Sequence, residues 1–194
     1  MLIEKLNKYN IVLGSSSPRR KKLLSDLGIH FTIKKTLAKE SYPKKLNGVE
    51  IAKFLAKQKG NNIIKKLSGN FLLITADTIV VQKNKLIHRP KNKNEAKEIL
   101  KNLSKKPHKV ISGVCIKSNK KEIVFSETTE VTFNKLEEEE INYYIDNFKP
   151  FDKAGSYGIQ EWIGYIGIKK INGSYNNVVG FPTAKFYQKL KLFI

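Results

Sequence analysis

The feature that most constrains the fold is a strand, turn and helix close to the N-terminus. The apolar residues 11–13 predict a short strand, and the small residues 14–17 predict a turn after it. Ser17 fits the N-cap of the next helix, and Pro18 fits its first position, where the missing N–H removes no hydrogen bond. Three leucines at helical spacing predict its buried face: Leu23, Leu24 and Leu27.

The charges at the start of this helix are unusual. Residues 19–22 are Arg-Arg-Lys-Lys, and they lie at the end where the helix dipole is positive. Each cation there is disfavoured by roughly 0.3–1 kcal/mol unless an anion is bound nearby. A helix N-terminus with exposed N–H groups is itself a site for anions. The segment therefore predicts a ligand that carries phosphate.

Arginine is rare in this chain, although basic residues are abundant. Of the 37 basic residues, three are Arg: Arg19, Arg20 and Arg89. Each lies beside a turn. Because the planar guanidinium can hold a phosphate or a carboxylate with two parallel hydrogen bonds, these positions are candidates for ligand contact. The alternative is that they pack on the surface without a ligand.

Length and composition favour one globular domain over residues 1–194. A chain of 194 residues that is 40% hydrophobic can bury a sizeable core. The lone Cys115 excludes an internal disulfide, and we see no signal peptide and no apolar run long enough to span a membrane. We expect a soluble, cytoplasmic protein.

The formal net charge of +20 raises the possibility of nucleic-acid binding. The lysines, however, are spread over almost every segment and do not form one stripe. We therefore expect at most weak, salt-sensitive binding to nucleic acid. A non-catalytic basic module that binds nucleic acid remains the alternative function.

Two carboxylates stand out in this basic chain. The continuous apolar run 71–76 predicts a strand buried on both faces, with Asp77 at its end. A buried carboxylate needs a cation, a metal ion or hydrogen bonds, so Asp77 is a candidate site residue. Glu40 is a single carboxylate in a basic loop, and it fits either a metal or substrate contact or a pairing with a nearby Lys.

The remaining pattern predicts alternating strands and helices after a polar lead-in over residues 1–9. Tyr157 and Gln160 lie among small residues in a glycine-punctuated segment, which suits contact with the edge of a base. The predicted strands are 29–36, 79–81, 110–117 and 122–134. The predicted helices are 49–67 with Asn47 as its cap, 93–103, 137–147 and 183–193.

Five motifs in order along the chain resemble the Maf family of nucleotide pyrophosphatases. The motifs are residues 13–24 (LGSSSPRRKKLL), 76–81 (ADTIVV), 152–160 (DKAGSYGIQ), 173–175 (GSY) and 178–182 (VVGFP). The resemblance implies an α/β fold like that of the inosine-triphosphate pyrophosphatases. That fold has a long mixed sheet, flanking helices and a cleft between two lobes. It also implies metal-assisted hydrolysis of a nucleoside triphosphate to the monophosphate and pyrophosphate.

The resemblance also implies roles for individual residues. Asp77 matches the proton acceptor, which activates water or helps to hold the metal. Arg19, Thr78 and Gln160 match positions that set base specificity. The resemblance further implies substrate contacts from Ser17, Arg20, Lys59 and Arg89, and Mg²⁺ or Mn²⁺ ligands from Glu40 and Asp77.

The motifs at 77–78 and 157–160 look like the branch of the family that acts on dTTP and UTP. The sister branch, which acts on 7-methyl-GTP, usually differs at both places, and modified pyrimidine nucleotides are a further possible substrate. The chain departs from the family pattern at Arg89, where Lys is usual, at Glu161, where Gly is common, and at Phe181, where Leu is usual. A homodimer is a further expectation from the family.

The chemistry of these residues is coherent. Attack of water on phosphorus needs charge neutralisation and positioning. Four cations and two carboxylates are therefore expected to converge on one cleft, the carboxylates holding the metal and orienting the water. These six residues are Arg19, Arg20, Lys59, Arg89, Glu40 and Asp77.

Overall fold

The computed structural model describes residues 2–36 and 41–194, and the chain divides into two compact units. Unit 1 comprises Met1–Asp77, Ser112–Glu127 and Gly180–Ile194. Unit 2 comprises Thr78–Ile111 and Thr128–Val179. Each unit buries hydrophobic clusters of its own.

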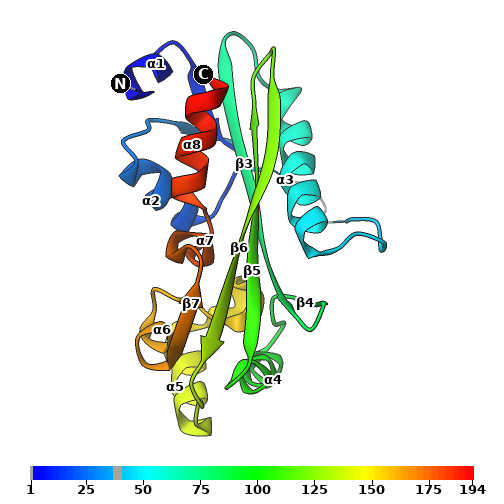
Figure 1. Cartoon of the computed structure of the whole chain (residues 1–194), viewed down its shortest axis with the longest axis vertical. Coiled ribbons are helices and arrows are strands. Elements are labelled where there is room, and N and C mark those ends of the chain that lie inside the picture. Colours follow the sequence, from blue (N-terminus) through cyan, green and yellow to red (C-terminus); the bar gives the residue numbers. More distant parts are fainter. Residues whose placement is uncertain (1, 37–40) are drawn as a thin grey trace. The chain divides into compact units, whose positions relative to one another are not determined.

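The strands form one mixed sheet in the order β2-β1-β3-β5-β6-β7, with β4 paired to β3. Helices flank this sheet, as the predicted α/β class requires (Figure 1). The strands are β1 (Asn10–Leu13), β2 (Thr32–Ile33), β3 (Phe71–Gln82), β4 (Lys85–Ile87), β5 (Pro107–Lys117), β6 (Glu122–Phe133) and β7 (Ile168–Asn172).

In unit 1, β1 has a parallel neighbour on each side. Val12 of β1 is in register with Thr32 of β2, and Leu13 is in register with Ile74 of β3. The chain therefore leaves β1 toward one neighbour and later returns to the other side. In open α/β sheets, ligands bind at the carboxyl ends of strands where the order reverses in this way.

Helices cover both faces of the sheet in unit 1 (Figure 1). α1 (Leu2–Leu6), α2 (Pro18–Asp26) and α8 (Thr183–Phe193) lie on one face, and α3 (Gly48–Ile64) lies on the other. Alternation along the strands divides the core accordingly. Leu13 and Ile74 pack with α2 and α8, while Val12 and Leu73 pack with α3.

The helix starts in unit 1 agree with the sequence. Ser17 caps α2, and its Oγ accepts a hydrogen bond from the backbone N of Arg20 at 3.5 Å. Asn47 and Glu50 form a reciprocal capping box at the start of α3, with distances of 3.0 and 2.8 Å. Both caps satisfy backbone donors that a helix start leaves unpaired.

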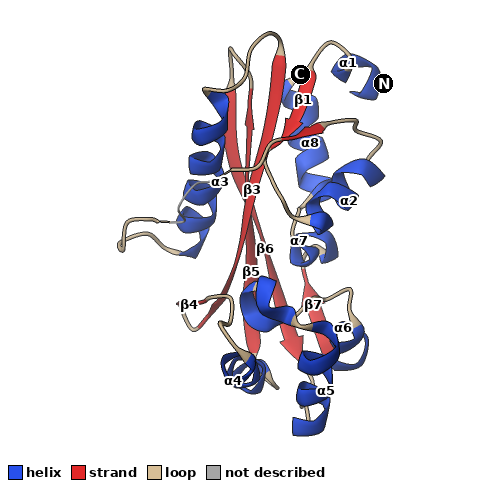
Figure 2. Ribbon diagram, turned by 180° about the vertical axis from the view of Figure 1, so that it is seen from behind, coloured by secondary structure: helices blue, strands red, loops and turns tan. Residues whose placement is uncertain are grey.

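Unit 2 includes two antiparallel strand pairings and four α-helices. β4 pairs antiparallel with β3, and β7 pairs antiparallel with β6 (Figure 2). The helices are α4 (Lys93–Leu103), α5 (Glu138–Phe148), α6 (Trp162–Gly167) and α7 (Tyr175–Val179). α4, α5 and the segment 157–163 share a core that includes Leu100, Tyr144 and Ile159.

Most of the predicted helices are confirmed, and 93–103 and 183–193 agree to the residue. Three predictions were wrong. The strand over 29–36 is reduced to Thr32–Ile33, because Ile33 is 43% exposed and the alternating side chains do not form a buried face. Residues 2–6 are α1 and not a polar lead-in, since Leu2 and Leu6 are buried. Finally, Asp77 does not end its strand, because β3 continues to Gln82.

The helices in the described part of the chain are either too short or too polar to cross a bilayer.

Candidate active site

Asp77 and Lys59 meet in unit 1, between β3 and α3. Side chains alternate along β3, so Asp77 shares a face with Thr75, whose hydroxyl donates to the carbonyl of Ala56 at 2.7 Å. Lys59 follows Ala56 by three residues and lies on the same face of α3. Its ammonium donates a hydrogen bond to Oδ1 of Asp77.

Both members of this ion pair are buried. Asp77 is 4% exposed and Lys59 is 7% exposed. Moving either charge out of water costs several kcal/mol, and their attraction offsets that cost only while both are present. Lys59 is therefore the cation that a buried Asp77 requires. A carboxylate can accept further hydrogen bonds, so Asp77 retains acceptor capacity beyond this one contact.

The turn between β1 and α2 is held by side-chain hydrogen bonds within unit 1. The buried Ser15 accepts through Oγ from the backbone N of Ser17 at 3.2 Å and from Nη1 of Arg20 at 3.5 Å. The Nε of Arg20 donates to the carbonyl of Gly180 at 3.0 Å. Arg20 thus joins this turn to a segment that lies 160 residues further along the chain.

The same turn starts beside β3. The N–H of Gly14 donates to the carbonyl of Ile74 at 2.8 Å, which continues the parallel pairing of β1 with β3. Gly14 therefore lies next to Thr75, two residues before Asp77. Unit 1 therefore contains both the turn that leads into α2 and the buried pair of Asp77 and Lys59. The half-buried Arg19 belongs to the same helix start.

Three other predicted site residues belong to unit 2. Thr78 is half-buried and follows Asp77 directly in β3. Arg89 is exposed, between β4 and α4. Gln160 is half-buried in the turn before α6, and its Oε1 is buried with no hydrogen-bond partner among residues 2–36 and 41–194. The convergence of Arg89 with Asp77 stays a prediction, and Glu40 lies outside the described residues.

The described residues contain no group of three or more His, Cys, Asp or Glu side chains that could hold a metal ion. A magnesium ion does not need such a group, because it usually keeps several waters and binds one or two carboxylates together with substrate phosphates. Asp77 supplies one hard oxygen ligand of this kind. The residues present therefore fit a metal that is shared with a nucleotide.

Sequence reasoning missed two parts of these arrangements. Ser15 was treated only as a turn residue, although its hydroxyl contacts Arg20. Glu161 was noted as a departure from the family, without a partner. In unit 2 it accepts a hydrogen bond from the hydroxyl of Tyr144 and pairs with Lys153 at 3.1 Å. No local signal in the sequence joins Tyr144 to Glu161, which lie 17 residues apart.

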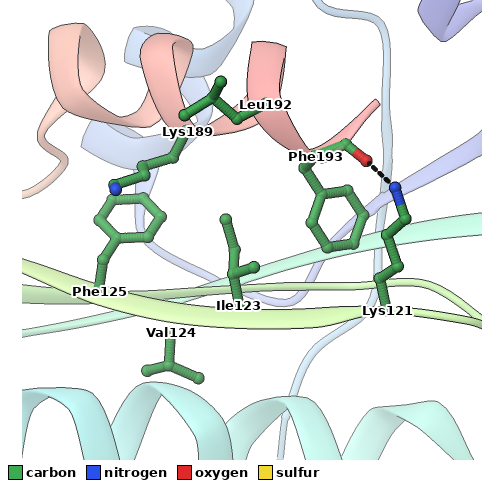
Figure 3. A pocket seen from close by; sticks show the side chains of 7 residues that line it. All are labelled: Lys121, Ile123, Val124, Phe125, Lys189, Leu192 and Phe193. Atoms are coloured by element: carbon green, nitrogen blue, oxygen red, sulfur yellow. Dashed lines mark hydrogen bonds between the residues drawn. The ribbon is translucent and has the colours of Figure 1, made fainter.

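A separate pocket of about 300 Å³ lies in unit 1, between α8 and β6 (Figure 3). Ile123 and Phe125 extend from β6 toward Leu192 and Phe193, whereas Val124 points to the opposite side of the strand. The ammonium of Lys121 donates to the carbonyl of Phe193 at 3.1 Å. None of the predicted site residues lines this pocket.

Two relatives that match this chain over nearly its full length carry the same name. A protein of Flavobacterium johnsoniae named dTTP/UTP pyrophosphatase is 47% identical over 190 residues, which cover 98% of each chain. One of Parabacteroides distasonis with the same name is 49% identical over 193 residues, which cover 99% of this chain and 100% of that one.

A solved structure described as nucleoside-triphosphatase / dITP/XTP pyrophosphatase from Mycobacterium abscessus matches 95% of this chain and 97% of its own. Its TM-score is 0.43 and its sequence identity is 13%. The family model described as Maf-like protein matches residues 10–193, which is nearly the whole chain. The protein therefore belongs to the Maf-like family.

Proposed function

We propose that this protein is a nucleoside triphosphate pyrophosphatase that hydrolyses dTTP and UTP to the monophosphate and pyrophosphate. The observation that carries the proposal is the buried pair of Asp77 and Lys59 in unit 1, the unit that also contains the cationic start of α2. Near-full-length relatives that are 44–49% identical carry the name dTTP/UTP pyrophosphatase, which supports this substrate class.

Asp77 is the proposed catalytic residue. Its carboxylate orients a water and accepts a proton from it as the water oxygen bonds to phosphorus. The bond that breaks is the anhydride bond between the α- and β-phosphates, and pyrophosphate leaves with the electron pair. Lys59 keeps the carboxylate in place, because a buried carboxylate without a cation would be strongly disfavoured.

The triphosphate is bound by fixed positive charge. Arg20 is oriented by Ser15 and Gly180, so its guanidinium is already ordered before a ligand binds. Arg19 and the N-terminus of α2, which Ser17 caps, add positive charge on the same segment. Arg89 is proposed to contact phosphate from unit 2, where the planar guanidinium replaces the Lys that the family usually has.

Gln160 is the residue that we propose to contact the base. Thr78 and Arg19 are proposed to contribute to base specificity as well. A buried acceptor without a partner is costly, and Oε1 of Gln160 is such an atom in the described structure. Thymine and uracil both carry an N3–H donor that could satisfy it. Cytosine has an acceptor at N3, so this position of the base would offer Oε1 no hydrogen bond.

We also propose a divalent metal, Mg²⁺ or Mn²⁺, held by Asp77 and Glu40 with the substrate phosphates. When bound, it would supply charge neutralisation for the triphosphate. The protein residues then position the metal-bearing nucleotide against the acceptor carboxylate.

We further propose that residues 1–194 form one pyrophosphatase domain. The protein is proposed to form a homodimer and to act in the cytoplasm.

The test is a substrate panel with the purified protein in Mg²⁺ or Mn²⁺. Pyrophosphate release is measured with dTTP, UTP, CTP, dATP, GTP and 7-methyl-GTP. We expect dTTP and UTP to be hydrolysed at least about 10-fold faster than CTP, the discrimination that one unpaired buried polar group supplies. Preference for 7-methyl-GTP would contradict the proposed substrate class, and retention on DNA without any hydrolysis would support the basic-module alternative.

A further inference from the structure

The turn that carries Gln160 is closed at both ends by one tyrosine hydroxyl. The backbone N of Glu161 donates to the carbonyl of Gly158 at 3.0 Å, so residues 158–161 form a tight turn. The hydroxyl of Tyr144, on α5, accepts from the N–H of Gly158 at 3.0 Å. The same hydroxyl donates to Oε2 of Glu161. Tyr144 therefore links the first and the last residue of the turn.

The carboxylate of Glu161 is held from a second direction. The ammonium of Lys153 lies 3.1 Å from Oε1 of Glu161, and Lys153 is 8% exposed. Lys153 also donates to Oδ1 of Asp152 at 2.8 Å. Each oxygen of the Glu161 carboxylate thus has its own partner. A charged pair in such a shielded place is held more firmly than one on the open surface.

The turn is built to accept this carboxylate. A Cβ added to Gly158 would lie 2.6 Å from Cδ of Glu161 and 2.8 and 2.9 Å from its oxygens. Only glycine leaves room for the carboxylate to lie over residue 158. On the other side of the turn, Ile159 is 3% exposed and belongs to the core of unit 2. Gln160 is therefore the one central residue of the turn that is not buried in the core.

We propose that Glu161 is a positioning residue that fixes Gln160 and thereby sets the discrimination among pyrimidine bases. The proposal rests on the proposed function, in which Gln160 contacts the base. Glu161 acts through the geometry of the turn, and it does not touch the substrate. Glycine at position 161 would leave Tyr144 and Lys153 without this shared partner, and the last residue of the turn would be held only by its backbone hydrogen bond to Gly158.

The hydroxyl of Tyr144 is suited to this role over a wide pH range. Burial, together with the hydrogen bond to Glu161, raises its pKa far above the ordinary value of 10.0. The hydroxyl therefore remains protonated at neutral pH and is the donor in its hydrogen bond to Glu161.

The experiment measures kcat and KM for dTTP, UTP and CTP in Tyr144→Phe, Glu161→Ala and Glu161→Gln. Since positioning affects binding of the base more than the chemistry at phosphorus, we expect KM for dTTP and UTP to rise about 5- to 20-fold in Glu161→Ala, with kcat within about 2-fold. Tyr144→Phe should shift KM in the same direction. Glu161→Gln keeps an acceptor for Tyr144 and should restore most of the wild-type KM.

The decisive comparison is made in a Gln160→Ala background. If Glu161 acts through Gln160, adding Glu161→Ala to Gln160→Ala changes KM by less than about 2-fold, because the residue it positions is already gone. If the two effects multiply, Glu161 acts on the fold in general and the proposal is overturned. Glu138→Ala is the matched control, since Glu138 is an exposed carboxylate in unit 2 that also bridges two lysines.

A second readout does not depend on activity. Trp162 is the single Trp of the chain and follows Glu161 directly, with its ring 4.8 Å from that of Tyr143. We expect Glu161→Ala to increase acrylamide quenching of Trp162, and Glu138→Ala to leave it unchanged. Equal quenching in wild type and Glu161→Ala would overturn the proposal. Absence of dTTP and UTP hydrolysis by the wild type would instead overturn the proposed function, and the quenching would still decide whether Glu161 fixes the turn.

Discussion

The ammonium of Lys59 donates a hydrogen bond to Oδ1 of Asp77, and both side chains are buried in unit 1. This pair joins α3 to β3 at the place where the sequence predicted a functional acid. Its energetics are asymmetric. Removal of one partner leaves a buried charge without compensation, whereas removal of both partners leaves no buried charge.

The first prediction concerns that asymmetry. Lys59→Met should lower the free energy of unfolding by about 3–5 kcal/mol, because Asp77 then has no cation. The double variant Lys59→Met/Asp77→Asn should recover a large part of that loss. Urea denaturation of the two single variants and the double variant measures the coupling.

Lys57→Met is the matched control. Lys57 belongs to the same helix and forms an ion pair with Glu122, but the Lys57 side chain is 51% exposed. It should cost no more than about 1 kcal/mol. If Lys59→Met and Lys57→Met destabilise the protein equally, the Lys59–Asp77 pair does not have the importance assigned to it.

The second prediction concerns how α3 is positioned. A Cβ added to Gly113 of β5 would lie 2.1 Å from the carbonyl oxygen of Ala52, so the backbones of β5 and α3 approach closely there. Gly113→Ala should lower the free energy of unfolding by about 3 kcal/mol or more, because neither backbone can move without disturbing the core. It should also lower activity, since displacement of α3 moves Lys59. Thermal unfolding and pyrophosphate release are the two measurements.

Gly60→Ala is the comparison within α3 itself. A Cβ there would meet the hydroxyl of Thr75 at 3.3 Å, which a small shift relieves. Replacing a glycine inside a helix adds up to about 1 kcal/mol of stability, so this variant should stay within about 1 kcal/mol of wild type. A Gly113→Ala variant as stable as Gly60→Ala would contradict the close contact between the backbones of β5 and α3 at Gly113.

The third prediction concerns Arg20. Its Nε donates to Gly180 and its Nη1 to Ser15, an arrangement that needs the planar fork of a guanidinium. Arg20→Lys keeps the charge but cannot make both contacts, so we expect KM for dTTP to rise about 10-fold through lost positioning. Lys21→Arg changes a neighbouring cation and should leave KM unaltered. An Arg20→Lys enzyme with wild-type KM would contradict the positioning role.

The fourth prediction is a pH dependence of stability that arises from His108. Burial lowers the pKa of His108 to about 4, from an ordinary value of 6.5. Its ring is packed between Phe133 and Tyr157, and Nε2 shares a hydrogen bond of 2.7 Å with the hydroxyl of Tyr157. The unfolded chain therefore binds a proton more readily than the folded one between these two pH values.

This group contributes its full stability above pH 6.5 and loses it as the pH falls toward 4. The loss should amount to about 3 kcal/mol, as the pKa difference implies. His108→Gln should flatten the fall in unfolding free energy between pH 6.5 and 4 in urea titrations. His30→Gln, which changes an exposed histidine, should not. An identical pH dependence in wild type and His108→Gln would refute the assignment.

Local chemistry in the sequence was sufficient to predict much of the fold. Ser17 and Asn47 have side-chain oxygens that cap a helix whatever the surroundings, so the starts of α2 and α3 could be predicted. The buried strand before Asp77 was also clear from its apolar run. The length of β3 was not, because pairing with β4 extends the strand past Asp77 and Thr78.

The partners of the site residues could be predicted less well. An acid in an apolar strand requires a cation, and Lys59 was identified through the family and not through contact geometry. Arg20 with Gly180 and Tyr144 with Glu161 depend on how distant segments pack. Such contacts leave no periodic pattern, so they become visible only in the folded chain.

The most direct measurement is pyrophosphate release from dTTP and UTP by wild type and Asp77→Asn, with Mg²⁺ or Mn²⁺ present. Asn has nearly the same shape as Asp but cannot accept a proton from water. We expect stoichiometric monophosphate and pyrophosphate from the wild type, and a rate at least about 100-fold lower from a folded Asp77→Asn variant, as loss of a general base implies. Equal rates in the two proteins, or no hydrolysis by the wild type, would contradict the account.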